Sequence, residues 1–237
     1  ASSGSTIQGN LGKYSLVGHM IAADASIAID FDKTSYFEGA SRVGGTGTID
    51  YRMDGTTWKL TDNSKVTSLA LHGDSSNVIF AGDSNFKTLT ISDLVGTDGH
   101  FAMRSDIVGN GTGNSTGDLL VVTGNSVGEH TVTVQNRGSA NSTGTETLTI
   151  IDTADGTAEF KLTQATEVGG YEYELRRTNA DSSNWELYGA RRSTSTGSAS
   201  INSFGAGYLL GYAETQTLLQ RMGDLRQSEV TGEPTGN

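Results

Sequence analysis

The sequence predicts an all-β protein wound as a β-solenoid with parallel strand ladders. Apolar and polar residues alternate with a period of two in many short runs, which is the pattern of half-buried strands. The 237 residues include 32 glycines but one proline, Pro234, and proline is excluded from internal strands. Most turns between the runs span about three to six residues, which favours stacked coils over a sandwich of tight two-residue hairpins.

The first part of the chain, residues 1–88, is predicted to form successive coils of this solenoid. Its strand runs recur about every 10 to 13 residues and are separated by turns rich in Gly, Asp, Asn and Ser. Each coil of about 20 residues or more would contribute two or three short strands. The predicted strands are residues 26–31, 48–51, 57–60, 66–71, 77–80 and 88–91.

Residues 89–190 are predicted to form a heavier terminal unit. Here the strands become longer and carry more aromatic residues, including the strands at 158–162, 171–175 and 185–188. Antiparallel hairpins in this unit would cover the open end of the solenoid, whose unpaired backbone groups otherwise invite aggregation. We expect its core to contain Phe160, Tyr171, Tyr173, Trp185 and Leu187. Gly124 and Gly128 are expected in turns where a Cβ would clash.

The C-terminal part of the chain has a different character. Residues 191–203 are small and polar and are predicted to be a linker. Residues 204–226 are predicted to form an α-helix, because Leu218, Met222 and Leu225 repeat at helical spacing and Gly223 stands near a helix stop. Residues 227–237 are expected to be a polar tail.

Composition and charge exclude several classes of partner. The formal net charge of −11 argues against binding to nucleic acid or to anionic lipid, because both require a basic surface. No apolar run is long enough for a membrane-spanning helix. The absence of cysteine fits a reducing compartment, but it equally fits a chain exported unfolded through a narrow pore.

Catalytic and metal-binding motifs are weak. Gly113–Gly117 matches the G-x-S-x-G pattern but lacks the strand before it and the helix after it that a nucleophile elbow needs. The histidines have no metal-ligand spacing, so neither a metal nor a cofactor is predicted. The four histidines are His19, His72, His100 and His130.

Scattered carboxylates leave one enzymatic alternative open. Some solenoid enzymes that cleave carbohydrate, of the tailspike or lyase type, align acidic residues on one face. Asp30, Asp50 and Asp93 stand in turns or at outward strand positions, where surface solubility explains them. A groove with convergent acids on three or more successive coils would favour such an enzyme.

Several motifs in the second half of the chain resemble one family. Gly117–Gly124 reads Gly-Asp-Leu-Leu-Val-Val-Thr-Gly, Gly128–Asn136 and Thr147–Thr153 follow, and Asn184–Tyr188 reads Asn-Trp-Glu-Leu-Tyr. The order and spacing of these segments, from about residue 90, resemble the C-terminal part of pertactin-like passengers of type V secretion autotransporters. The segment Gln220–Arg226 is similar to the helix that leads into their membrane barrel.

The resemblance implies a right-handed parallel β-helix ending in an autochaperone unit that folds first at the cell surface and templates the remaining coils. It implies a partner, the chain's own C-terminal β-barrel translocator, whose pore would hold Leu218, Met222, Gly223 and Leu225. It also implies display of an adhesin-like monomer at the outer membrane of a Gram-negative bacterium, with no catalysis. The alternatives are the carbohydrate-active β-helix enzyme and a plain β-sandwich binding domain.

Overall fold

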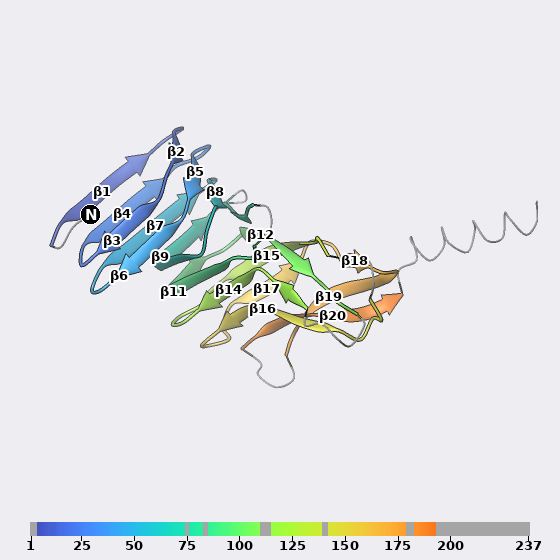
Figure 1. Cartoon of the computed structure of the whole chain (residues 1–237). Helices are drawn as coiled ribbons and strands as arrows, with labels where there is room; N and C mark the ends of the chain where they lie inside the picture. The colour runs from blue at the N-terminus through green and yellow to red at the C-terminus, as the bar shows by residue number, and fades with distance from the viewer. Residues whose placement is uncertain are drawn as a thin grey trace, which may run out of the picture. The chain divides into compact units, whose positions relative to one another are not determined.

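The described part of the chain is built from β-strands (Figure 1). The structure is a computed structural model that describes residues 4–73, 76–82, 85–109, 115–138, 142–178 and 183–192. These ranges contain no α-helix and therefore no helix able to span a membrane. The predicted linker from residue 193, the predicted helix 204–226 and the predicted tail lie outside the described residues.

Two long sheets wind around a common core. The first sheet contains seven parallel strands, each placed beside the strand of the preceding coil. They are β1 (Thr6–Leu11), β4 (Ser26–Phe31), β7 (Thr48–Asp54), β9 (Ser64–His72), β11 (Thr88–Gly96), β14 (Leu119–Val122) and β16 (Thr147–Thr153).

The second sheet alternates with the first along the chain and is also parallel through seven strands. They are β2 (Ser15–Val17), β5 (Tyr36–Gly39), β8 (Thr57–Leu60), β10 (Asn77–Phe80), β12 (Gly99–Asp106), β15 (Glu129–Asn136) and β17 (Glu159–Leu162). A small third sheet pairs β3 (Met20–Ala23) with β6 (Ser41–Gly44) in parallel. The chain therefore returns to the same face once per coil, which confirms the predicted parallel β-solenoid and rules out the sandwich for this part of the chain.

The length of a coil increases along the chain. In the early coils the paired residues are relatively close in sequence, since Ser26 pairs with Thr48 and Thr57 pairs with Asn77. Further on, longer stretches of chain separate the partners, and Thr88 pairs with Leu119 and Gly99 with His130. Part of the increase lies in the second-sheet strands, which have four residues in β8 and β10 and eight in β12 and β15.

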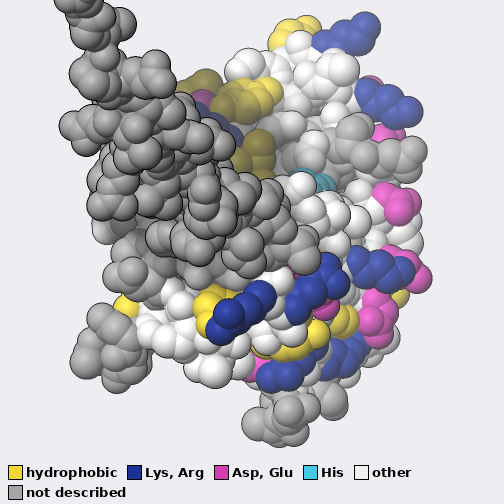
Figure 2. Space-filling model, turned by 90° about the vertical axis from the view of Figure 1, so that its right-hand side faces the viewer, with side chains coloured by type: hydrophobic (Ala, Val, Ile, Leu, Met, Phe, Trp, Pro, Cys, Tyr) yellow, Lys and Arg dark blue, Asp and Glu magenta, His cyan; other side chains and the backbone are white. Residues whose placement is uncertain are grey.

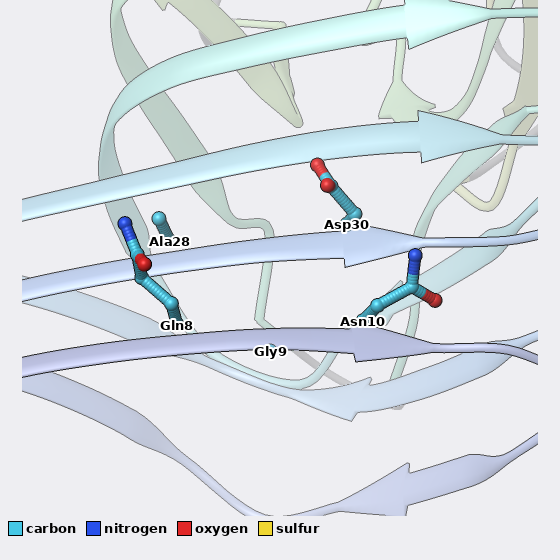
Figure 3. Close-up of a pocket in the computed structure, with 5 residues that line it drawn as sticks. All are labelled: Gln8, Gly9, Asn10, Ala28 and Asp30. Carbon is cyan, nitrogen blue, oxygen red and sulfur yellow. The ribbon is translucent and has the colours of Figure 1, made fainter.

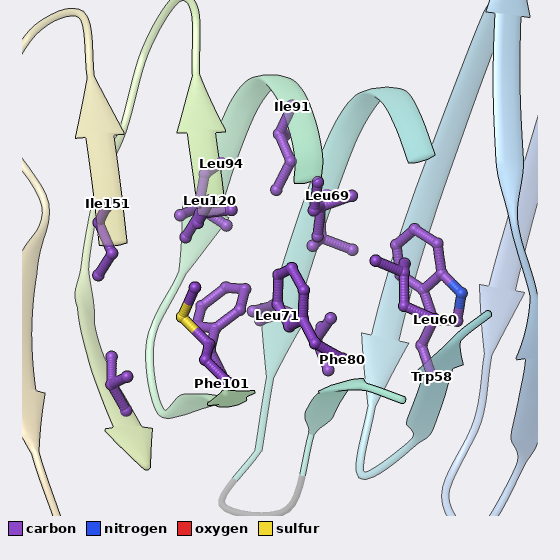
Figure 4. Close-up of a cluster of buried hydrophobic side chains, with 14 of the residues drawn as sticks. Trp58, Leu60, Leu69, Leu71, Phe80, Ile91, Leu94, Phe101, Leu120 and Ile151 are labelled. Atoms are coloured by element: carbon purple, nitrogen blue, oxygen red, sulfur yellow. The ribbon is translucent and has the colours of Figure 1, made fainter. Parts of the chain in front are cut away.

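The core lies between the two long sheets and consists of inward-pointing side chains that stack coil upon coil (Figure 4). One such column follows the second sheet from Phe37 through Trp58 and Val78 to Phe101. The Trp58 ring is fully buried, and its Nε1 donates a hydrogen bond to the Gly39 carbonyl at 3.0 Å. Alternation of apolar and polar residues thus selects the buried face of every strand.

A column of buried hydroxyls borders this core in the first coils. Ser35, Thr56 and Ser76 each immediately precede a strand of the second sheet and are buried. Their side chains donate to backbone carbonyls at the ends of first-sheet strands, for example Ser76 Oγ to Met53 O at 3.1 Å. These bonds satisfy carbonyls that leave the ladder at the corner of each coil.

The parallel winding ends in antiparallel strands. β20 (Trp185–Arg192) pairs antiparallel with β16, β19 (Tyr171–Arg177) pairs antiparallel with β20, and β18 (Thr166–Val168) pairs antiparallel with β19. The short β13 (Thr116–Gly117) pairs antiparallel with β12. Parallel ladders thus continue through β17, well beyond residue 100, and antiparallel pairing on the first sheet is confined to β16 and the last three strands.

Replacing Trp58 by alanine is expected to lower the free energy of unfolding by about 3–5 kcal/mol, because the change removes a fully buried ring and leaves a cavity. Urea unfolding followed by circular dichroism measures the change. Val17→Ala is the matched control, since the Val17 side chain is 72% exposed, and it should change stability by less than about 0.5 kcal/mol. Equal effects of the two substitutions would contradict the assigned core.

Candidate functional site

The end of the solenoid formed by β16 to β20 is the candidate functional site. Figure 2 faces this end, and Lys, Arg, Asp and Glu side chains lie there among hydrophobic ones. β20 adds to the first sheet beside β16, and β19 and β18 extend the sheet further. The three added strands therefore occupy the edge on which another parallel coil would otherwise pair.

An aromatic stack connects this end with the coils before it. The Phe101 and His130 ring centroids are 5.9 Å apart, those of His130 and Phe160 5.6 Å, and those of Phe160 and Trp185 5.8 Å. Three of these rings come from successive strands of the second sheet and the fourth from β20. The two long sheets are thus joined through contacts between large flat side chains.

The structure brings most of the expected terminal core residues together. Phe160, Tyr173, Trp185 and Leu187 are all buried and belong to one hydrophobic cluster. Tyr171 is only partly buried and packs at the margin of that cluster. A Cβ on Gly144 would lie 2.2 Å from the Tyr171 ring, so glycine is what allows the 142–146 turn to approach it.

Gly124 and Gly128 lie in the turn before β15, and both approach the preceding coil closely. A Cβ on Gly128 would lie 1.7 Å from the carbonyl oxygen of Gly96, and its φ of 110° also requires glycine. A Cβ on Gly124 would lie 2.8 Å from the Ser92 carbonyl oxygen. Stacked turns of adjacent coils leave no room for side chains at these positions.

A polar clamp holds the turn before β16 against β19. The Tyr173 hydroxyl donates to the Glu146 carboxylate and contacts the Ser142 hydroxyl, while the backbone N–H groups of Thr143 and Gly144 donate to the same carboxylate at 3.0 Å each. Partial burial alone would raise the pKa of Glu146, but the hydrogen bonds from Thr143 and Tyr173 outweigh it and hold that pKa well below 4.5. Burial and the bond to Glu146 raise the pKa of Tyr173 to about 12.

Arginines on the last hairpin cover its aromatic rings. The Arg176 guanidinium lies 4.3 Å from the Tyr188 ring centroid, and that of Arg177 lies 4.6 Å from the Trp185 centroid. Arg176 also pairs with Glu186, and Arg177 pairs with Glu159 on β17. Their long stems shield apolar surface while their charged ends stay near water, so the end of the solenoid presents a polar surface.

A buried ion pair fixes the longer coils, and the sequence analysis did not identify it. Asp118 is completely buried and accepts hydrogen bonds from Arg104 Nε at 2.8 Å and from Arg104 Nη2 at 2.7 Å. The Lys87 backbone N–H also donates to Asp118, and Arg104 donates to the carbonyls of Gly82 and Asn85. The pair therefore anchors two connecting segments. An acid directly before the apolar run at 119–122 was the available signal.

The acids considered for catalysis do not form a convergent groove. One outward-facing column of the first sheet contains, coil by coil, Gln8, Ala28, Asp50, Ser68 and Asp93. Its two acids, Asp50 and Asp93, are therefore on coils that are not adjacent, because the coil between them has Ser68 at this position. Partial burial, and then the Asp93 carboxylate, raise the pKa of Asp50. At the start of the second-sheet strands, Asp98, Glu129 and Glu159 follow one another on three successive coils. Glu129 pairs with Lys161 and Glu159 with Arg177, so two of these three carboxylates are engaged by cations.

A shallow hollow at the N-terminal edge of the first sheet adds little to the enzymatic alternative. Figure 3 shows Gln8 and Asn10 of β1 and Asp30 of β4 on the same side of the sheet. Gly9 and Ala28 complete its lining. Two amides and one carboxylate can hydrogen-bond a ligand, but they lack the second acid that hydrolysis of a glycosidic bond requires.

The histidines are dispersed and play different parts. His130 is buried in the aromatic stack, whereas His100 lies on the outer face of β12, where its ring nitrogens contact the hydroxyls of Thr131 and Thr133. Within the described ranges, no three His, Asp or Glu residues are placed to hold a metal ion. Gly113 and Asn114 of the G-x-S-x-G match lie outside those ranges.

Comparison with models of known protein families identifies the family of this chain. The family model described as Pertactin matches residues 66–189, which is more than half of the chain and includes β10 to β19 and most of β9 and β20. This chain belongs to the pertactin family. The match starts earlier than residue 90, where the resemblance of the motifs begins, so it also covers part of the shorter coils.

Relatives of this pertactin-family chain are autotransporters. It is 34% identical to the "Probable autotransporter YcgV" of Escherichia coli over 93% of this chain and 27% of the relative. It is 28% identical to the BrkA autotransporter of Bordetella pertussis over 89% of this chain and 20% of the relative. The chain thus spans about a quarter or less of these relatives' length. The solved Hap adhesin of Haemophilus influenzae matches 78% of this chain and 22% of that one at 18% identity, with a TM-score of 0.48.

Replacing Trp185 by alanine is expected to destabilise the protein by about 3–5 kcal/mol, because its ring is 6% exposed and packs on Phe160. Thermal or urea unfolding measures the effect. Glu129→Ala removes only an exposed ion pair with Lys161, so this control should cost less than about 1 kcal/mol. An unchanged midpoint for Trp185→Ala would show that the ring is not packed as described.

The clamp at Glu146 is expected to make stability depend on pH in acid. Because the folded-state pKa of Glu146 is lowered, its contribution is present above pH 4.5 and is lost as pH falls below 4.5 toward the folded-state value. Glu146→Gln should therefore lower stability at pH 7 and flatten its decline between pH 4.5 and 2.5. Urea midpoints across this range test the prediction. A variant with the same decline as wild type would contradict it.

Proposed function

We propose that this chain is a C-terminal passenger segment of an autotransporter and that its terminal unit, residues 89–190, nucleates folding of the passenger during secretion. The observation that carries the proposal is the closure of the first sheet by three antiparallel strands whose Trp185 extends the aromatic stack of the coils. Such a unit has local hairpin contacts and an apolar core, both of which a parallel coil lacks by itself.

The energetic argument begins with the cost of the first coil. Residues that pair in the longer coils stand far apart in sequence, as Gly99 and His130 do, so loop-closure entropy is lost before any contact is gained. The hairpin of β19 and β20 pairs Arg177 with Trp185, which are much closer along the chain. A unit containing such local pairs forms early, and each later coil adds to an existing ladder.

Folding outside the cell can also supply direction to secretion. Every coil that joins the ladder buries apolar side chains such as Phe101 and Val132 and pairs its backbone, so it cannot slide back through a narrow pore. A stable terminal unit that emerges first would start this process. The names of the relatives, which are autotransporters, support a role in secretion.

The remaining parts of the proposal concern the whole protein. The solenoid is right-handed, as parallel crossover connections almost always are. The partner is a β-barrel translocator that follows the chain, with Leu218, Met222, Gly223 and Leu225 of the predicted helix inside its pore. The passenger is displayed as an adhesin-like monomer at the outer membrane of a Gram-negative bacterium, and it binds a surface ligand without catalysis.

Pulse-labelling hydrogen exchange during refolding tests the nucleation proposal. Backbone amides of β16, β19 and β20 are expected to become protected before those of β4 and β7. Trp185→Ala should slow the appearance of protection throughout the chain, because it weakens the nucleus. Trp58→Ala, a matched loss of a buried tryptophan in the early coils, should mainly speed unfolding. Protection that appears first in β4 and β7 would overturn the proposal.

A further inference from the structure

His130 occupies an unusual place for an ionisable side chain. It lies on β15 and is almost completely buried at 1% exposure. Its ring packs against those of Phe101 and Phe160, whose centroids are themselves 6.3 Å apart. In the register of the ladder, the same column is occupied by Thr56, Ser76 and Gly99 in earlier coils and by Phe160 in the next one. A titratable ring thus stands where the core changes from hydroxyls to aromatic rings.

The cavity around the ring is shaped to fit it. A Cβ on Gly99 would lie 2.9 Å from His130 Nδ1, and a Cβ on Gly128 would lie 3.5 Å from Nε2. The absence of a side chain at Gly99 therefore leaves the space that the imidazole fills, and Gly128 lies near the other ring nitrogen. Neither ring nitrogen makes a hydrogen bond of normal geometry to any described residue. The site is therefore suited to a neutral ring of imidazole size.

Few charges face His130. The carboxylate of Asp98, in the turn before β12, is close enough to raise the pKa of His130. The turn 124–128 has no ionisable side chain, and the Val127 backbone is its polar group that affects His130. On β17, Glu159 and Lys161 flank Phe160 but point outward, with side chains 52% and 68% exposed. On β9, the apolar side chain of Leu71 lies next to Gly99, beside the His130 ring. The following residue, His72, is only half-buried. The Val127 backbone and the Asp98 carboxylate are therefore the described groups that favour an imidazolium, and the effect of burial on the pKa of His130 outweighs both.

We propose that His130 is an acid-sensitive latch: its neutral ring holds β15, β17 and the terminal hairpin together, and its protonation opens them. A proton added in the closed state would bury a cation beside two phenyl rings, where the Val127 backbone and Asp98 do not offset the lost solvation, and this is costly. Proton uptake is therefore coupled to separation of Phe160 and Trp185 from the coils. In mildly acidic surroundings the end of the solenoid would open while the early coils stay folded.

The sign and the pH window follow from linkage. Burial lowers the pKa of His130 below its ordinary 6.5, and the opposing effects of the Val127 backbone and the Asp98 carboxylate do not offset it. Above pH 6.5 the ring is neutral in both the closed and the open state. As the pH falls below 6.5, His130 is protonated first in the open state. The equilibrium constant for opening therefore rises by up to about tenfold per pH unit until the closed-state pKa is reached. The carboxylates with lowered pKa values, such as Glu146 and Asp155, act only below pH 4.5.

Native-state hydrogen exchange of the 237-residue chain at pH 7.5 and 5.0, corrected for intrinsic exchange rates, tests the proposal. We expect opening of β15, β17 and β20 to increase between about 10- and 30-fold at pH 5.0, with β4 and β7 unchanged. His130→Gln and His130→Phe should remove this increase. His72→Gln is the matched control, since His72 is half-buried on β9, outside the cluster formed by Phe101, His130, Phe160 and Trp185, and it should keep the increase.

Three results would overturn the latch. They are a wild-type equilibrium constant for opening that does not change with pH, an increase that persists in His130→Gln, and an increase that His72→Gln abolishes. If His130→Phe does not fold, His130→Gln alone decides the variant arm. In addition, the Cε1 proton of His130 in the folded wild type should titrate well below pH 6.5 by NMR, and titration at 6.5 in the folded state would contradict the proposal directly.

Discussion

The continuity of backbone pairing from coil to coil is the constraint on which the rest of this structure depends. Every strand of a parallel ladder exposes an unpaired edge until the next coil covers it, and the last coil has no successor. On the first sheet the chain reverses direction, and β20, β19 and β18 extend that edge in antiparallel order. Local turns between these strands are possible because antiparallel neighbours need no crossover.

The side chains along the core change in step with this transition. The early coils use small hydroxyls, such as Ser35 and Thr56, at the corner where the chain leaves the first sheet, and each hydroxyl satisfies a carbonyl. The later coils replace them with Gly99, His130 and Phe160, so the corner becomes aromatic and connects with Trp185. The increase in coil length accompanies this change. The pertactin family match spans the transition, which lies at the part of the chain that we propose to fold first.

Much of the fold and part of the candidate site could be predicted from the sequence. Period-two alternation located most strands, and aromatic residues at 160, 173 and 185 indicated a core that the structure does bury. The extent of parallel winding was not predictable, because alternation is the same in parallel and antiparallel strands. The ion pair of Arg104 and Asp118 and the burial of His130 were also missed, since both depend on which coil lies next to which.

The sequence by itself determined which side of each strand faces the core and where turns must interrupt the strands, because these properties depend on neighbouring residues alone. Only the tertiary structure decided which strands are partners, for those partners belong to successive coils whose length varies, and no local pattern encodes that length. It also decided the surroundings of His130. A histidine in an alternating strand can face water or the core, and here stacking of Gly99 below it and Phe160 above it placed the ring inside.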